Sequence, residues 1–427
     1  MVEVEDASGF KGEAERLIEP ASEEELIGIT GAGEPVTISG ARTGLTGGCV
    51  PEGGWAVSLE KFRRLEICPG RAVVGPGVSL EQVQRAAAQT GQFYAPDPTE
   101  RTASIGGTIA TNASGSRGFR YGSTRRHILR LRVAMMDGRV REFRRGDEID
   151  FDVPALPLPK TTKNTAGYLL APGMDWIDLI AGSEGTLGIV TEAELQLLPA
   201  PREVLAGVVF FETDAAALDA VDAWRKIEGL RMLEYFDARS LKLLGADAGA
   251  ALLVEQENGD IDFWAERASG ESWFAASDRD RERFRQFRHA LPELVNDTMR
   301  RRGFLKLGSD YAVPIERNRE MLEFYHAELA ERALDYVVFG HIGDAHVHVN
   351  ILPKSQAEFD AGQRAMLEFA RQAVALGGTV SAEHGLGKRK RHLLELQYTR
   401  DQIEAMKGVK RRLDPRCLLN RGNLFAH

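Results

Sequence analysis

The stretch GHIGDAHVHVN, residues 340–350, places three of the chain's nine histidines within eight positions. The flanking runs YVVFGH and HVHVNIL predict two strands joined by a turn at IGDA. In such a hairpin His341 and His346 lie near each other across the turn, and His348 shares a face with His346 because side chains alternate along a strand. Neutral imidazole is a common ligand of zinc and similar divalent ions, so the pattern indicates a metal site.

A second motif, GGTVSAEHGLGKRK at residues 377–390, adds the carboxylate of Glu383 and a fourth histidine, His384. A carboxylate oxygen often completes a histidine metal site. A single histidine is more often structural than a ligand, and H-x-H on a strand can be a half-exposed sheet face. Four histidines in two glycine-flanked motifs favour chemistry over that alternative.

Glycine-rich loops form the other chemical pattern. The segment SGARTGLTGGCVPEGG, residues 39–54, lets successive backbone N–H groups converge on an anion. It lacks the lysine of a P-loop and the G-x-G-x-x-G of a Rossmann fingerprint, and one alternative is a loop whose glycines only turn the chain. Residues 95–125 and 180–193 repeat the composition. Three such loops predict a long phosphate-bearing ligand, a dinucleotide rather than a mononucleotide.

The bulk composition limits the class of protein. A chain of 427 residues exceeds one ordinary core, which predicts two modules. The net charge of −9 disfavours a nucleic-acid binder. Cys49, Cys68 and Cys417 form no C-x-x-C pair, which disfavours an iron–sulphur cluster in this chain. The acidic N-terminus and the lack of a long apolar run predict no signal peptide and no membrane span. We expect a cytoplasmic protein, with peripheral docking on a membrane partner left open.

The elements that must position these motifs follow from periodicity and turn residues. GEAERLIEP and SEEELIGIT predict two helices near the N-terminus, with Ser22 and Glu25 spaced as a capping box. Residues 55–198 alternate short strands with glycine-dense loops around a helix at SLEQVQRAAAQTG. LPAPRE, residues 198–203, is the best linker candidate. Beyond it, alternating strands and helices predict an α+β unit with an antiparallel sheet.

The segments ARTGLTGG, PDPTERTASIGGTIATNASG and GSEGTLGIVTEA resemble the FAD-contacting segments of the vanillyl-alcohol oxidase and p-cresol methylhydroxylase type of flavin-binding domain. The resemblance implies an α+β fold: a two-subdomain FAD-binding domain at 1–199, a cap or substrate domain at 200–380, and a segment at 381–427 that completes the active site. The first loop has no histidine to attach flavin covalently, so we expect dissociable FAD. The implied FAD-lining residues are Ala41, Arg42, Thr43, Gly44, Leu45, Thr46, Pro96, Ser104, Gly106, Gly107, Thr111, Gly115, Glu184, Gly185 and Ile189.

FGHIGDAHVHVN and GTVSAEHGLGKRK are similar to paired motifs of the FAD-linked D-2-hydroxy acid dehydrogenases, a group that includes D-lactate and D-2-hydroxyglutarate dehydrogenases and the glycolate oxidase flavin subunit. The resemblance implies that His341, His348 and Glu383 hold a divalent metal, zinc first and manganese or iron as alternatives. It makes His384 the catalytic base. Where relatives usually have Gly-Asn, this chain has Ala345 and His346. That leaves open whether His346 joins the metal or replaces an amide that held substrate.

FRHALPELV, residues 287–295, resembles the family segment whose arginine binds the substrate carboxylate, which indicates Arg288. The alternative is an exposed arginine on a highly charged helix. Lys306 is out of register with the family lysine and is a weaker candidate. The closing DPRCLLNRGN resembles the family's last segment, which implies that Asn420 returns to the flavin. The basic run GKRKRH, residues 387–392, is interpreted as a solvated surface or a docking patch for an electron acceptor.

The resemblance predicts FAD-dependent oxidation of a D-2-hydroxy acid, D-lactate first, with glycolate and D-2-hydroxyglutarate as alternatives. An external acceptor is then required: a quinone, a cytochrome, an electron-transfer flavoprotein or an iron–sulphur partner. A homodimer is plausible in this family. Alternatives from other classes are a metal-dependent hydrolase built on HVH, a non-catalytic flavoprotein subunit, and a redox-neutral enzyme of the alkylglycerone-phosphate synthase type.

Overall fold

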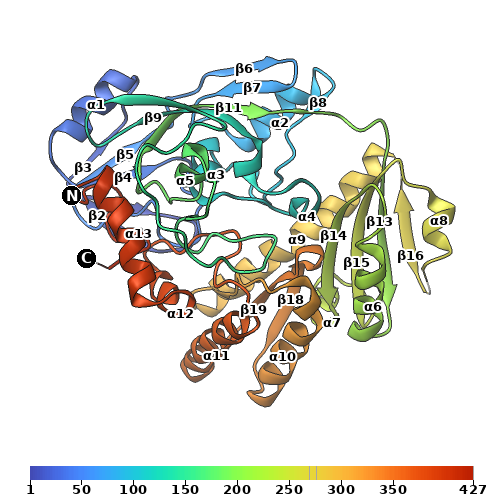
Figure 1. The fold of residues 1–427 in the computed structure, drawn as a ribbon. Helices are drawn as coiled ribbons and strands as arrows, with labels where there is room; N and C mark the ends of the chain where they lie inside the picture. Colours follow the sequence, from blue (N-terminus) through green and yellow to red (C-terminus); the bar gives the residue numbers. More distant parts are fainter. Residues whose placement is uncertain (269, 276, 427) are drawn as a thin grey trace.

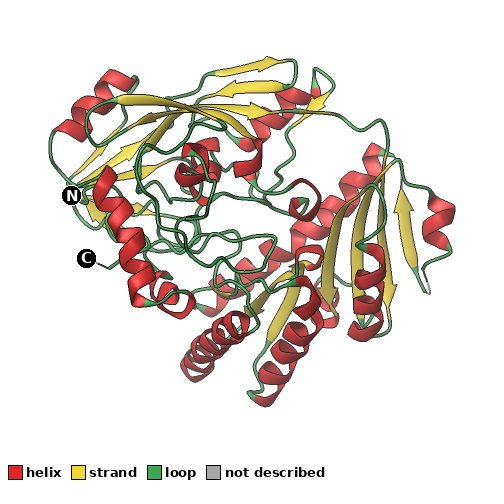
Figure 2. Cartoon of the chain, in the orientation of Figure 1, coloured by secondary structure: helices red, strands yellow, loops and turns green. Residues whose placement is uncertain are grey.

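The computed structural model describes residues 1–268, 270–275 and 277–426. Two groups of strands and helices lie side by side, and the C-terminal part of the chain returns to the N-terminal group (Figure 1). Long loops occupy the region between the two groups (Figure 2). The predicted two-module α+β architecture is confirmed.

The first part of the chain forms a small hairpin and a parallel three-stranded sheet in the order β3-β5-β4. Helix α1 (Glu23–Gly31) packs on this sheet through Leu26 and begins, as predicted, at Ser22, whose side chain accepts from the Glu25 amide. The strands are β1 (Val2–Glu5), β2 (Lys11–Ala14), β3 (Arg16–Ile18), β4 (Val36–Ser39) and β5 (Trp55–Ser58).

The helix predicted at GEAERLIEP is wrong. This segment instead forms β2, which pairs with β1, and β3, which pairs in parallel with β5. Pairing with the preceding strand β1 and with the more distant β5 overrides the moderate helix propensity of these residues.

A second sheet of the N-terminal half is antiparallel, in the order β10-β9-β11-β7-β6. Its strands are β6 (Leu65–Cys68), β7 (Arg71–Val74), β9 (Ile128–Ala134), β10 (Val140–Arg144) and β11 (Ile189–Gln196). The predicted helix is confirmed as α2 (Leu80–Ala88), which begins with a capping box at Ser79 and Gln82. The shorter elements are α3 (Ile105–Thr111), α4 (Gly118–Tyr121), η1 (Thr124–His127) and α5 (Trp176–Ile180).

The linker candidate LPAPRE is only partly a linker. Its first residues form β12 (Leu198–Pro199), which pairs with β8 (Gln92–Phe93), and the Ala200 amide still donates to Gly91 O, so the connection to the cap begins after Ala200. The next strand, β13 (Val204–Phe211), belongs to the other large sheet. This supports the predicted boundary between residues 199 and 200. The division into 1–199, 200–380 and 381–427 stays a prediction.

The cap is built on a seven-stranded antiparallel sheet in the order β16-β13-β15-β14-β18-β19-β17, which confirms the predicted antiparallel sheet. Its strands are β13 (Val204–Phe211), β14 (Leu230–Asp237), β15 (Ala250–Glu257), β16 (Ser272–Ala275), β17 (Leu307–Gly308), β18 (Tyr336–His341) and β19 (His346–Ile351). The helices are α6 (Asp214–Trp224), α7 (Ala238–Leu243), α8 (Ile261–Ala265), α9 (Asp278–Arg302), η2 (Ile315–Arg317), α10 (Asn318–Glu331) and α11 (Gln356–Ala375).

Both faces of this sheet are covered. Val208 and Phe210 of β13 contact the same apolar cluster as Leu291 of α9, whereas Val209 and Phe211 belong to the main core with α6 and α10. This alternation is the period of two expected of a strand buried on both faces. Helix α9 therefore lies directly against the sheet that carries the histidine hairpin.

The predicted histidine hairpin is confirmed. His341 ends β18 and pairs with His346 at the start of β19, and Phe339 pairs with His348. A short 3-10 turn, η3 (Ile342–Asp344), joins the strands, and Ala345 after it has a left-handed backbone with φ 51°.

The C-terminal segment is built into the N-terminal half. It contains η4 (Arg391–Leu393), α12 (Leu394–Gln397) and α13 (Arg400–Leu413), the last drawn in red in Figure 1. The Val36 amide donates to Leu418 O, and the Asn420 amide donates to Val36 O, so the chain end extends the edge at β4. Within residues 1–268, 270–275 and 277–426, no helix has the length and apolar composition needed to cross a membrane.

The buried Lys410 anchors this segment, and its replacement by Met should destabilise the fold. Its Nζ donates to Thr186 O, to Leu419 O and to Asp414 Oδ2, the last at 2.6 Å. Loss of the cation leaves Asp414 buried without its ion pair, which should lower the free energy of unfolding by about 3 kcal/mol. Urea unfolding followed by circular dichroism measures the change.

Lys407→Met is the matched control. Lys407 pairs with Glu404 on the same helix, but 31% and 48% of the two side chains are exposed, so its loss should cost less than about 1 kcal/mol. Equal urea midpoints for the two variants would contradict the role given to Lys410.

Candidate active site

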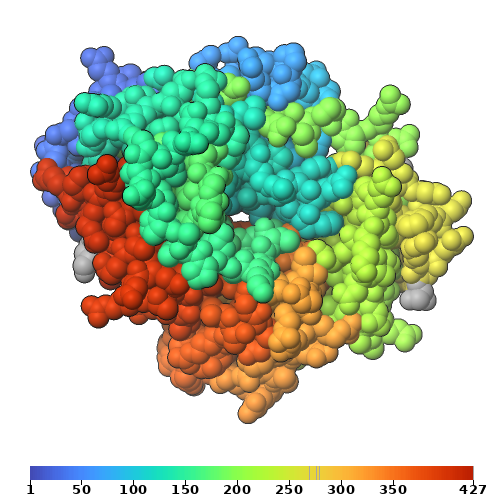
Figure 3. Space-filling model, viewed as in Figure 1, coloured from blue at the N-terminus to red at the C-terminus, as the bar shows by residue number. Residues whose placement is uncertain are grey.

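One cavity of about 300 Å³ runs along the inner side of the N-terminal half and ends at the histidine hairpin. Its size is at the lower end of the range for ligand sites. Figure 3 shows a hollow where the N-terminal half meets the C-terminal part of the chain. The cavity is lined by these predicted FAD residues: Ala41, Arg42, Thr43, Gly44, Leu45, Thr46, Ser104, Gly106, Gly107, Thr111, Glu184, Gly185, Ile189 and Asn420.

Two residues predicted to line the FAD site, Pro96 and Gly115, are not among those that line the cavity. Pro98 and Thr99 take part in its wall instead. Gly115 has φ 84°, and a Cβ there would lie 2.0 Å from Asp97 O. Its amide donates to Glu383 Oε1 at 2.8 Å. The glycine thus orients Glu383 of the second histidine motif, and its contact with flavin stays a prediction.

The first glycine-rich loop has the donors that a pyrophosphate needs. No described residue accepts a hydrogen bond from the backbone N–H groups of residues 42–46, all of which line the cavity. Arg42 has a left-handed backbone with φ 56°, which changes the direction of successive amides. Successive unpaired N–H groups form a concave anion site, so the residues present fit the phosphates of FAD.

Glu184 joins the flavin loops to the second histidine motif. Its two carboxylate oxygens accept from the amides of Leu386 and Gly387, each at 2.7 Å. Burial raises the pKa of Glu184 to about 7, although these two amides favour its ionised form. Asn420 donates to Glu184 O and accepts from the Ile38 amide, which brings the end of the chain to the same place.

The interpretation of GKRKRH as a solvated surface is wrong for Lys388, whereas the other basic side chains of the run are half-buried or exposed, and its role as a docking patch stays a prediction. Lys388 is buried and donates to Asn423 Oδ1, and Lys390 donates to Gly308 O. Arg389 and Arg391 donate to backbone carbonyls of Ser8 and Gly422. Burial lowers the pKa of Lys388 to about 8. The run connects separate parts of the chain because its cations satisfy buried acceptors.

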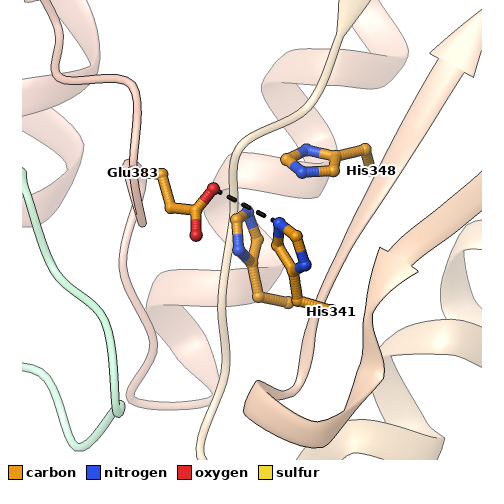
Figure 4. A group of neighbouring side chains, drawn as sticks. His341, His348 and Glu383 are labelled. Carbon is orange, nitrogen blue, oxygen red and sulfur yellow. Dashed lines mark ion pairs between the residues drawn. The ribbon is translucent and has the colours of Figure 1, made fainter. Parts of the chain in front are cut away.

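The two histidine motifs meet in space. One ligand atom from each of His341, His346, His348 and Glu383 lies within 4.8 Å of the others. His341 Nε2 is 3.3 Å from Glu383 Oε2, the pair joined by the dashed line in Figure 4. Figure 4 also shows His348 turned toward the same space. This donor set suits a divalent cation.

In two of these rings, Nδ1, the nitrogen that points away from the cluster, donates a hydrogen bond. His341 Nδ1 donates to Glu234 Oε1 at 2.6 Å, and His348 Nδ1 donates to Ser309 O at 3.0 Å. A carbonyl oxygen can only accept, so Nδ1 of His348 carries the proton and Nε2 is bare. Burial acts to raise the pKa of Glu234, but Arg288 and His341 hold it at about 2. Oriented imidazoles with a bare Nε2 are typical of metal ligands.

Glu383 is oriented by the N-terminal half. Its Oε1 accepts from Ser114 Oγ at 2.7 Å, from the Gly115 amide and from Lys163 Nζ at 2.6 Å. Burial opposes ionisation, yet Lys163 and His341 hold the pKa of Glu383 well below its usual range. Three donors on one oxygen leave the other to face the histidines.

His384 lies at the cavity wall beside the cluster of His341, His348 and Glu383. Its ring stacks on His348 with centroids 5.4 Å apart and an interplanar angle of 11°. Its backbone amide donates to Asp310 Oδ2 at 2.9 Å, and its Nδ1 lies 3.5 Å from Asp310 Oδ1. Burial lowers the pKa of His384 despite this carboxylate. A neutral imidazole in this place is suited to accept a proton.

Arg288 is not the exposed arginine of the alternative interpretation. Only 11% of its side chain is exposed, and its Nε donates to Glu234 Oε2 at 2.7 Å. Its Nη2 donates to the hydroxyl of Thr99, which lines the cavity. Arg288 therefore reaches the cavity edge through Thr99. Lys306 is not a lining residue, although burial and Lys390 lower its pKa to about 8.

The sequence prediction missed four polar residues that contact the histidines or Glu383 in this site: Ser114, Lys163, Glu234 and Asp310. Glu234 had a usable signal, since a charge inside the apolar strand LRMLEYFD needs a buried partner. Lys163 and Asp310 lie in loops without periodicity, and their roles follow only from burial.

The comparisons with known proteins agree with this arrangement. Residues 14–144 match the family model described as "FAD binding domain", and residues 200–424 match "FAD linked oxidases, C-terminal domain". The chain belongs to the FAD-linked oxidase family. It is therefore an FAD-linked oxidoreductase, which replaces the metal-dependent hydrolase alternative.

Similar proteins cover nearly the whole chain. A D-lactate dehydrogenase of Archaeoglobus fulgidus is 30% identical over 96% of this chain and 90% of its own length. The glycolate oxidase subunit GlcD of Bacillus subtilis is 31% identical over 92% and 84%. A D-2-hydroxyglutarate dehydrogenase of Xanthomonas citri pv. viticola is 32% identical over 91% and 84%.

A solved alkyldihydroxyacetonephosphate synthase has a similar fold. The TM-score is 0.65 at 15% identity, and the alignment covers 95% of this chain and 76% of the synthase. At this identity the similarity concerns the fold alone.

The Ser114 hydroxyl should tune the affinity of the histidine cluster for a divalent cation. Ser114→Ala removes one of three donors to Glu383 Oε1. Loss of a hydrogen bond that orients a ligand residue weakens metal binding by about tenfold. Zinc titration of chelator-stripped protein against a chromogenic chelator measures the change.

Ser116→Ala is the control two residues away. The Ser116 hydroxyl is buried, and among the described residues it has no hydrogen-bond partner. Its removal should leave zinc affinity unchanged. Equal affinities of the two variants would contradict the positioning role of Ser114.

Proposed function

We propose that this protein oxidises a D-2-hydroxy carboxylate, D-lactate first, to the 2-oxo acid. The observation that carries the proposal is one cavity whose wall joins the unpaired amides of residues 42–46 to His348, Glu383 and His384. A flavin bound along the glycine-rich loops would thus share its cavity with a base and a cluster of metal ligands. The names of the similar proteins support the same substrate class.

Arg288 is assigned to the substrate carboxylate. Its Nε donates to Glu234, and among the described residues the hydrogen-bond acceptor of its Nη2 is Thr99 at the cavity wall. A carboxylate can replace the neutral hydroxyl of Thr99 as acceptor, because a charge-assisted hydrogen bond is stronger. Glu234 also holds His341, so substrate binding and the histidine cluster are coupled through one carboxylate.

His384 is assigned to the hydroxyl proton. Its ring lines the cavity beside His348, while Asp310 behind it stabilises the imidazolium formed after proton transfer. FAD supplies the acceptor for the hydride that leaves C2. A divalent cation held by His341, His348 and Glu383 would lower the pKa of the substrate hydroxyl. The protein's own residues orient the carboxylate and remove the proton, which leaves a 2-oxo acid and reduced flavin.

Reoxidation of the flavin is assigned to an external acceptor: a quinone, a cytochrome, an electron-transfer flavoprotein or an iron–sulphur partner. Cys49, Cys68 and Cys417 are free thiols scattered over the structure and do not form a cluster site. FAD is bound without a covalent bond in this proposal, since no histidine lies in the first glycine-rich loop.

The test is the visible spectrum of the FAD-loaded protein, recorded anaerobically before and after addition of D-lactate, D-2-hydroxyglutarate or glycolate. Bleaching of the flavin band by one of them identifies the substrate and supports the proposal. A flavin band that none of them bleaches would contradict it and favour a redox-neutral enzyme or a non-catalytic subunit.

His384→Asn should slow flavin reduction by roughly 10²-fold to 10⁴-fold, since the variant lacks the proton acceptor. The substrate dissociation constant should change far less, because Arg288 remains. Anaerobic stopped-flow at several substrate concentrations separates the two quantities.

His392→Asn is the control, because His392 is an exposed histidine near the same motif. It should reduce flavin at the wild-type rate. A wild-type rate of reduction in the His384 variant would remove the assignment of the base.

A further inference from the structure

His346 belongs to the histidine cluster, at a position where the family that this chain resembles usually has an amide. It is fully buried, with 0% of its side chain exposed. Its ring centroid lies 4.5 Å from that of His348 and 5.4 Å from that of His341. His346 lies on the same hairpin as His341 and His348, so the register of the two strands determines its position.

Neither ring nitrogen of His346 is satisfied. Among the described residues, Nδ1 and Nε2 have no hydrogen-bond partner with acceptable geometry, although Nε2 is 3.2 Å from Asp310 Oδ1. A fully buried imidazole without partners is costly, and such groups in native proteins call for an explanation. A bare nitrogen aimed into a group of other donors is the condition for metal ligation.

One alternative is that His346 replaces an amide that touches substrate. His341, His348, Glu383 and His384 all line the cavity, but His346 is not among the lining residues. A substrate in the cavity therefore meets the other histidines first. His346 instead lies behind them, with its ligand atom within 4.8 Å of those of His341, His348 and Glu383.

We propose that His346 is a fourth protein ligand of the divalent cation, in a site of three imidazoles and one carboxylate. The inference rests on the metal site of the proposed function. Glu234 accepts a hydrogen bond from His341 Nδ1 and so orients that ring. Asp310 lies 3.2 Å from His346 Nε2 without forming such a bond, so among the described residues both nitrogens of His346 remain available to a cation.

The donor set determines which cation is preferred. Three imidazole nitrogens favour zinc and iron, whereas manganese prefers oxygen donors. Exchange of His346 for Asn removes one nitrogen donor. The variant should therefore lose zinc affinity by roughly tenfold or more, with a smaller loss for manganese.

The first experiment needs no variant. Zinc K-edge X-ray absorption of the zinc-loaded, FAD-containing protein counts the imidazoles bound to the metal. Three imidazoles support the inference, and two would overturn it.

The second experiment measures zinc and manganese affinities by competition with a chromogenic chelator. It compares wild type with His346→Asn, His348→Asn and a control, His326→Asn. His326 lies on α10 and bonds to Tyr336, away from the cluster. We expect both cluster variants to lose zinc affinity and the control to retain it.

The outcomes separate the two proposals. If His348→Asn loses zinc but His346→Asn binds it as wild type does, the inference about His346 fails and the metal site stands. If wild type itself binds no zinc, manganese or iron at the cluster, the metal site of the proposed function fails, and the inference fails with it.

Discussion

An ionised carboxylate taken out of water is stable only beside positive charge or several hydrogen-bond donors. Glu234, Asp310 and Glu383 are three such groups, and all of them lie within the histidine region. Each is placed next to an imidazole, and Glu234 and Glu383 also meet Arg288 and Lys163. The need to neutralise these charges fixes the orientation of the rings, because a rotated imidazole would leave a carboxylate unpaired.

The same requirement joins the two halves of the chain. Glu383 takes three donors from the N-terminal half and faces the cap hairpin with its other oxygen. Arg117 of the N-terminal half likewise pairs with Glu255 in the cap sheet. Separation of the two halves would leave these charged side chains without their ion-pair partners. The cavity is therefore complete only when the two halves are in contact.

Local patterns predicted much of this structure, and long-range contacts explain most of what they missed. The register of His341 and His346 follows from the length of one turn, and Ser22 and Ser79 begin helices by their own hydrogen bonds. The strand at residues 11–14 pairs with β1 directly before it, and the sequence reasoning missed this local hairpin. The strand at residues 16–18 was mistaken for part of a helix because its partner, β5, lies about 40 residues further along the chain. Lys163 and Lys388 were missed or misassigned for the same reason, since a lysine in a loop is typical of a surface until its acceptors are known.

In the histidine hairpin, the backbone conformation of the turn does not depend on which side chain stands at position 346. Ala345 holds a left-handed backbone, φ 51°, which costs a residue with a Cβ about 1 kcal/mol relative to glycine. The turn nevertheless keeps His341 opposite the residue at position 346. The strand pairs use only main-chain groups, so an imidazole or an amide at position 346 fits the same register. The strand pairing therefore determines the position of residue 346, while the type of its side chain determines which donor atom lies there. In this chain that atom is a ring nitrogen of His346, which is buried and has no hydrogen-bond partner among the described residues. The divalent cation proposed above is the partner that best accounts for it.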